Sequence, residues 1–148
     1  MTGRYFEDFQ PGDVIETEGA TLTEAQIIDF ALTYDPQPFH LDVVAAGKSL
    51  FGGLIASGFQ TLALSFRLLR DTGIITGTGL GGAGADELRW LASVRPGDTL
   101  RVRAEVLDKK LSSKGGRGTV RIAYATLNQR GETVLTATFL HLVAARGG

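Results

Sequence analysis

The sequence contains no cysteine and no long apolar run, and each absence excludes a class of structure or chemistry. Without cysteine, the chain of 148 residues forms no disulfide, no thiolate metal site and no cysteine nucleophile. No window approaches the roughly eighteen apolar residues of a membrane-spanning helix. The first residues, Met1–Asp8, lack the apolar stretch of a secretory signal. We therefore expect a cytoplasmic protein.

An excess of charge of one sign is also missing. Fifteen basic residues stand against sixteen acidic ones, which leaves a formal charge of -1. This balance gives no broad attraction to nucleic acid or to a membrane surface, so we expect neither as a partner, although a local basic patch for a phosphorylated ligand stays open. The content of 43% hydrophobic and 21% charged residues is typical of a soluble globular protein, and we expect one domain over residues 1–148.

Local signals predict helices in the first half of the chain. Thr23 and Gln26 have the spacing of a capping box, and apolar residues follow at helical intervals until Pro36 ends the helix. A longer helix is predicted over Gly58–Asp71, with Ser57 as its N-cap. Because apolar residues cover most of its circumference, we expect this helix to be buried.

From Ala85 onward the apolar pattern changes to a period of two. It predicts strands over Leu100–Val106 and Val120–Thr126, and a central strand over Thr133–Ala144. A shorter strand is expected over Val14–Gly19. Long antiparallel strands with one buried helix predict an α+β fold, in which a curved antiparallel sheet wraps around a central helix.

The segment from Asp35 to His40 holds the strongest candidates for chemistry. Pro36 and Pro38 each fix one backbone angle, so the segment is stiff, and we expect it to be non-helical. A carboxylate and an imidazole at fixed positions suit general acid–base catalysis, since histidine titrates near neutrality. The spacing alone also fits a loop in which Asp35 caps backbone amides and His40 is half-buried.

A second candidate site lies at Ser57 and Gly58, where the chain enters the long predicted helix. A helix N-terminus offers unpaired N–H groups and a partial positive charge. Gly58 has no side chain, so a ligand can approach its backbone closely. Such a site suits a thioester carbonyl and the enolate oxygen that develops from it. An ordinary serine N-cap after a flexible loop fits these residues equally well.

These residues resemble the motif of the MaoC-like dehydratase and (R)-specific enoyl-CoA hydratase family. Asp35, Pro38 and His40 match the motif, and Ala46 stands at the expected distance after His40. The stretch before Gly58 is similar to the family's entry into its central helix. Further similarity lies downstream, in Leu88–Trp90 and in Val94–Leu100. The motif departs at three positions: Tyr34 replaces a glycine, Gln37 an asparagine and Phe39 an aliphatic residue.

The resemblance implies a hot-dog fold and the reversible hydration of a trans-2-enoyl thioester to a 3-hydroxyacyl thioester. It implies that Asp35 and His40 are catalytic, and that Gly58, Ser57 and Gln37 bind substrate or its oxyanion. Coenzyme A or an acyl-carrier protein would carry the acyl group, with no metal and no redox cofactor. Family members also form dimers by joining two sheets edge to edge, so a homodimer or higher homo-oligomer is expected.

Other patterns are interpreted structurally. Gly77–Gly82 matches G-x-G-x-x-G, but a dinucleotide site needs a strand before it and a helix after it, so we expect a glycine-rich loop. Lys114–Arg117 is interpreted as a solvated hairpin turn, and His141 as a structural histidine of the last strand. Asp42 is expected to cap a short helix. Arg89 and Trp90 are assigned to strand packing and an ion pair.

Two other functions stay open at this point. Hot-dog thioesterases also combine an acidic residue with a helix N-terminus, so hydrolysis of an acyl-CoA thioester is an alternative. A non-catalytic module that binds acyl thioesters would need the pocket without the Asp35 and His40 pair, and the presence of both residues argues against it.

Overall fold

The computed structural model describes residues 3–147. Its helices, in chain order, are the 3-10 helix η1 (Phe6–Asp8), α1 (Glu24–Tyr34), α2 (Pro38–Leu41), α3 (Val43–Gly47) and α4 (Gly58–Asp71). Its strands are β1 (Val14–Glu16), β2 (Ala20–Thr21), β3 (Gly79–Trp90), β4 (Thr99–Leu111), β5 (Arg117–Leu127) and β6 (Thr133–Ala144). No helix in this part of the chain is long and apolar enough to cross a membrane.

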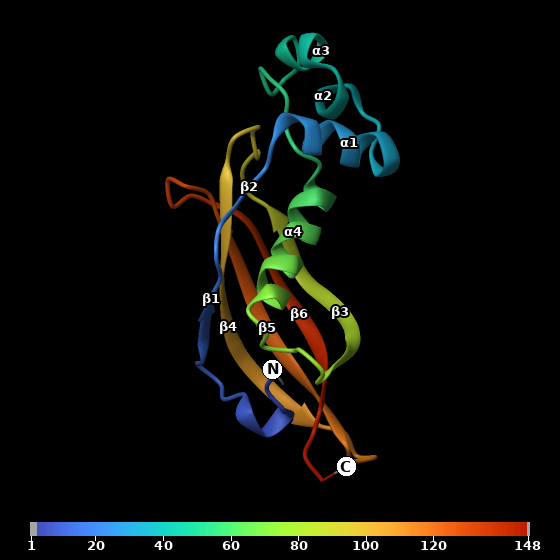
Figure 1. Ribbon diagram of the computed structural model, residues 1–148, viewed down its shortest axis with the longest axis vertical. Helices are drawn as coiled ribbons and strands as arrows, with labels where there is room; N and C mark the ends of the chain where they lie inside the picture. Colours follow the sequence, from blue (N-terminus) through green and yellow to red (C-terminus); the bar gives the residue numbers. More distant parts are fainter. Residues whose placement is uncertain (1–2, 148) are drawn as a thin grey trace.

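The strands form one antiparallel sheet in the order β1-β4-β5-β6-β3, with β2 pairing with β4. The long strands bend around α4, and α1, α2 and α3 gather beyond one end of the sheet (Figure 1). This is the α+β arrangement that the sequence predicts. The curvature fits strands of 11 to 13 residues, which are longer than the usual five or six residues.

Two apolar clusters hold the helices to the sheet. One lies under the C-terminal half of α4, where Leu68 and Leu69 pack against inward-facing side chains of β4 and β5. The other joins the α1–α3 group to the ends of the strands through Ile27, Ala46 and Leu135. The second cluster anchors the group of helices that carries the candidate site, so the position of that site depends on it.

Helix α4 is buried along one side, and the predicted burial does not extend to its other side. Phe59 and Phe66 are 58% and 39% exposed, whereas Thr61 and Ser65 are buried. The Ser65 hydroxyl lies 2.6 Å from Thr126 Oγ1 on β5 and donates to, or accepts from, it. A hydroxyl group that forms a hydrogen bond with the facing strand can be buried at little cost in free energy. The spacing of residues along the helix does not reveal such a partner on another strand.

Strand β3 begins at Gly79, earlier than the expected start of the strands after Ala85. The run Gly79–Gly82 therefore lies in a strand rather than in a glycine-rich loop. This strand is the edge of the sheet, and nearly all of its residues are exposed. An edge strand of glycines with no buried face lacks the alternation of apolar and polar residues that reveals other strands. Strand β1 is also shorter than predicted and ends at Glu16.

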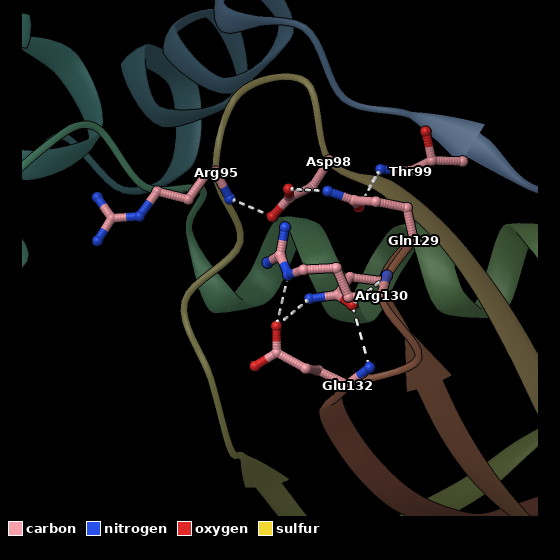
Figure 2. Close-up of polar contacts among 7 residues, drawn as sticks. Arg95, Asp98, Thr99, Gln129, Arg130 and Glu132 are labelled. Carbon is pink, nitrogen blue, oxygen red and sulfur yellow. Dashed lines mark hydrogen bonds and ion pairs between the residues drawn. The ribbon is translucent and has the colours of Figure 1, made fainter.

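A cluster of polar side chains ties the β3–β4 connection to the β5–β6 hairpin (Figure 2). The buried Asp98 carboxylate accepts from the backbone N–H of Arg95 at 2.9 Å and from Gln129 Nε2 at 2.8 Å. Gln129 Oε1 in turn accepts from the backbone N–H of Thr99 at 3.0 Å. The Arg95 guanidinium donates to the carbonyl of Phe51. This cluster therefore links the sheet to the loop that precedes α4.

His141 lies in the interior of the helix–sheet layer, as its structural interpretation requires. It is 5% exposed, and its Nε2 lies 2.8 Å from the buried hydroxyl of Tyr124. Burial lowers the pKa of His141 to about 4 and raises the pKa of Tyr124 above its usual range. Both side chains are therefore neutral at pH 7.

The low pKa of His141 predicts a loss of stability in mild acid. Below about pH 6.5 the unfolded chain binds a proton at His141 that the folded chain refuses until about pH 4. The free energy of unfolding should therefore fall by up to about 3 kcal/mol between these pH values, in addition to the effects of other groups. Urea denaturation of the native protein and of His141→Gln measures the difference, which should disappear in the variant. Equal pH slopes for the two proteins would contradict the assignment.

Candidate active site

Asp35 and His40 are placed by the connection between α1 and α2. Asp35 is the C-cap of α1, with φ -153° and ψ 68°, and Pro36 prevents the helix from continuing. Pro38 is the first residue of α2, where its fixed φ suits a helix start. His40 therefore lies on a short helix, and the prediction of a non-helical backbone is wrong after Gln37. The second proline starts a helix instead of extending a loop.

The two side chains face each other. His40 Nε2 lies 3.2 Å from Asp35 Oδ2, and His40 Nδ1 lies 2.7 Å from the carbonyl oxygen of Ile55. A carbonyl oxygen only accepts hydrogen bonds, so Nδ1 carries a hydrogen. Nε2 then donates to the carboxylate when the imidazole carries a second hydrogen. His40 is 4% exposed, which holds this geometry in place.

The Asp35 carboxylate is supported by two further donors. Ser57 Oγ donates to Oδ2 at 2.7 Å, and Gln37 Nε2 donates to Oδ1 at 2.6 Å. Burial opposes ionisation of this carboxyl, but the hydrogen bonds from Ser57 and Gln37, together with the charge and hydrogen bond of His40, outweigh it. They hold the pKa of Asp35 below its usual range. Asp35 is therefore ionised at neutral pH.

Ser57 and Gln37, for which the sequence predicts contact with the substrate or its oxyanion, both contact Asp35. Ser57 is fully buried, and its hydroxyl proton is committed to the carboxylate. The same oxygen caps α4 by accepting from the backbone N–H of Phe59 at 3.3 Å. Gln37 is exposed beside the pair. Both side chains orient Asp35, which spacing along the chain could not reveal.

The N-terminus of α4 presents one free donor next to the pair. The N–H of Gly58 has no hydrogen-bond partner among residues 3–147, whereas the next three N–H groups all bond to Ser57. The space beside Gly58 is not empty, because a Cβ there would lie 2.4 Å from Trp90 Nε1. Trp90, which the sequence assigned to strand packing, therefore belongs to the site. In the sequence, only the similarity of Leu88–Trp90 to the family could have indicated that Trp90 belongs to the site.

These groups open onto a cavity of about 450 Å³. Asp35, His40 and Gly58 all line it, and the rest of its wall is largely aromatic and apolar, formed by Phe39, Phe51, Ile55, Ala56, Phe59, Trp90, Leu91 and Val94. A larger cavity of about 550 Å³ lies near the other end of α4, but no carboxylate lines it. The smaller cavity is the candidate active site, because Asp35, His40 and Gly58 all line it.

The remaining sequence candidates stay outside this cavity. Asp42 caps α3 by accepting from the N–H groups of Val44 and Ala45, as expected. Lys114 lies in the exposed turn between β4 and β5. Within residues 3–147, no group of three or more histidine, aspartate or glutamate side chains could hold a metal ion.

The fold and site define an α+β protein with a candidate acid–base pair at the entry to its central helix. The chain belongs to the MaoC-like domain family, whose profile matches residues 8–126. It is 34% identical over 124 residues to the uncharacterised protein YdeM of Bacillus subtilis, covering 84% of this chain and 87% of that protein. It is 31% identical over 137 residues to a mesaconyl-CoA hydratase of Cereibacter sphaeroides, but spans only 39% of that protein.

Solved structures also resemble this chain. The MaoC-like dehydratase from Rhodospirillum rubrum superimposes with a TM-score of 0.91 and 42% identity, covering 99% of this chain and 100% of that one. A Mycobacterium tuberculosis protein described as a double hot-dog fold superimposes with a TM-score of 0.80, covering 98% of this chain and 45% of that one. At 19% identity it shows the fold alone. The hot-dog fold predicted from the sequence is confirmed.

Proposed function

We propose that the protein adds water to a trans-2-enoyl thioester, and removes it again, with Asp35 and His40 as its catalytic residues. One observation carries the proposal: His40 Nε2 and the Asp35 carboxylate lie 3.2 Å apart at a cavity that Gly58, whose N–H is free, also lines. The similarity to a mesaconyl-CoA hydratase supports the same reaction class. Coenzyme A enters as part of the substrate.

The thioester oxygen accepts a hydrogen bond from the Gly58 N–H at the positive end of α4. This donor gains importance as charge moves onto the oxygen in the enolate, and loss of one such donor typically raises a barrier by about 2.7–4 kcal/mol. The apolar wall of the cavity excludes competing water and holds the acyl group, which places C2 and C3 of the substrate beside Asp35 and His40.

In our proposal the pair moves two protons in opposite directions. The low pKa of Asp35 keeps its carboxylate ionised. We assign the transferable proton to His40 Nε2, which faces that carboxylate. Asp35 takes a proton from the water whose oxygen attacks C3, and His40 delivers its proton to C2. The proton on Asp35 then returns to His40 across their 3.2 Å contact. Water is added, and the pair ends as it began.

The proposal predicts hydration of trans-2-enoyl-CoA esters, followed as loss of the conjugated double bond. Asp35→Asn and His40→Ala should each lower kcat by about 10²–10⁴-fold, because each removes a positioned proton carrier. Ser57→Ala should cause a smaller loss, since Asp35 keeps its Gln37 and His40 contacts. Asp42→Asn is the matched control: it changes a nearby carboxylate to an equally good cap and should leave kcat unchanged.

Other outcomes favour other functions. Release of free thiol from acyl-CoA esters, lost in the same variants, would replace the proposal by thioester hydrolysis. Saturable binding of acyl-CoA without turnover, unaffected by Asp35→Asn, would indicate a binding module. A panel that varies chain length and branching, offered on coenzyme A and on acyl-carrier protein, identifies the acyl group and its carrier.

We also propose that the active form is a homodimer joined through β3. The twelve residues of β3 form the edge of the sheet, and a long exposed edge invites pairing with another strand. Large exposed apolar side chains lie beside this edge, namely Phe59, Phe66, Leu80, Trp90 and Leu91. Antiparallel pairing of two β3 strands sets the glycine-rich start of one against the Trp90 end of the other. The larger cavity of one subunit then lies beside the catalytic cavity of its partner.

Sedimentation analysis tests the dimer. Gly84 has open space around its backbone within the chain, so Gly84→Lys should fold normally but place a bulky charge on the paired edge. We expect a dimer for the native protein and a monomer for this variant. Gly47→Lys introduces the same side chain at an equally open position on α3 and should remain a dimer. A monomeric native protein, or dissociation by both substitutions, would refute pairing through β3.

A further inference from the structure

Trp90, the only tryptophan of the chain, covers the N-terminus of α4. Its indole Nε1 donates to the carbonyl oxygen of Gly58 at 2.8 Å, and its ring meets the Phe59 ring edge-on with centroids 5.7 Å apart. Trp90 is 47% exposed and lines the candidate active-site cavity. The side chain is therefore not part of the apolar core, and its hydrogen bond holds it against the helix.

The indole occupies the space that a side chain at position 58 would need. A Cβ built on Gly58 would lie 2.4 Å from Trp90 Nε1 and 2.5 Å from Trp90 Cε2, and the three nearest atoms all belong to Trp90. Gly58 does not need glycine for a left-handed backbone, because it is the first residue of α4. The close approach of the indole is therefore sufficient to explain why position 58 is glycine.

A continuous series of hydrogen bonds connects this indole to the catalytic pair. The carbonyl of Gly58, which accepts from Trp90, shares a peptide plane with the N–H of Phe59. That N–H donates to Ser57 Oγ at 3.3 Å, and Ser57 Oγ donates to Asp35 Oδ2 at 2.7 Å. Rotation of this peptide plane would therefore move the hydroxyl that holds the Asp35 carboxylate.

We propose that Trp90 is a positioning residue: its indole fixes the Gly58–Phe59 peptide plane, and through Ser57 the orientation of Asp35. Gly58 is glycine so that the indole can reach that plane. This inference rests on the proposed function only where it concerns catalysis by Asp35. The contact between Trp90 and Gly58 can be tested without any activity.

The contact predicts that substitutions at positions 58 and 90 compensate. Gly58→Ala in the native background displaces the indole, so the fluorescence emission should shift to longer wavelength and the urea midpoint should fall. In a Trp90→Ala background the added methyl group has free space, and alanine favours a helix over glycine, so the midpoint should stay or rise. An equal decrease in both backgrounds would overturn the inference, as would an unshifted emission spectrum.

Kinetics test the positioning role. Trp90→Phe keeps an aromatic wall but removes the indole N–H, so kcat should fall about three- to tenfold, as expected for one hydrogen bond, with KM nearly unchanged. Gly58→Ala should lower kcat/KM at least about fivefold in the native background and less than about twofold in the Trp90→Ala background. If Trp90→Phe has the same kcat and KM as the native protein, Trp90 only lines the cavity and the positioning role is refuted. Absence of hydration by the native protein would refute the proposed function, while the fluorescence and urea results would still decide the contact.

Discussion

The hydrogen bond from Ser57 to Asp35 joins the two parts of the molecule on which the candidate site depends. Ser57 is the N-cap of α4, the helix that the sheet wraps, and its buried hydroxyl holds a carboxylate at the end of α1. Because Ser57 Oγ both accepts from the helix and donates to the carboxylate, the position of Asp35 follows that of α4. The sheet thus positions an acid–base pair that none of its strands carries.

The sequence predicted the architecture and the residues of the pair better than it predicted their surroundings. Alternating patterns reveal β4 and β5 because each has one buried face, whereas β3 has none and was placed too late. The prolines around Asp35 predict a stiff, non-helical segment, yet Pro38 starts a helix. The contact of Trp90 with Gly58 joins residues that are far apart in the chain, so no local pattern could predict it.

The two buried histidines have different partners. His141, paired with a neutral hydroxyl, is held uncharged by its surroundings. His40 is equally buried but faces a carboxylate whose low pKa keeps it ionised. Of the two histidines, His40 thus combines a charged partner with the candidate active-site cavity.

The carbonyl of Ile55 fixes the hydrogen on Nδ1 of His40, and in the proposed reaction Nε2 is therefore the atom that exchanges a proton with Asp35 and the substrate. Nitrogen-15 NMR of the imidazole rings tests it directly, with His141→Gln used to assign the signals. We predict that neutral His40 carries its hydrogen on Nδ1 and that protonation occurs at Nε2. A neutral His40 with its hydrogen on Nε2 would contradict the account.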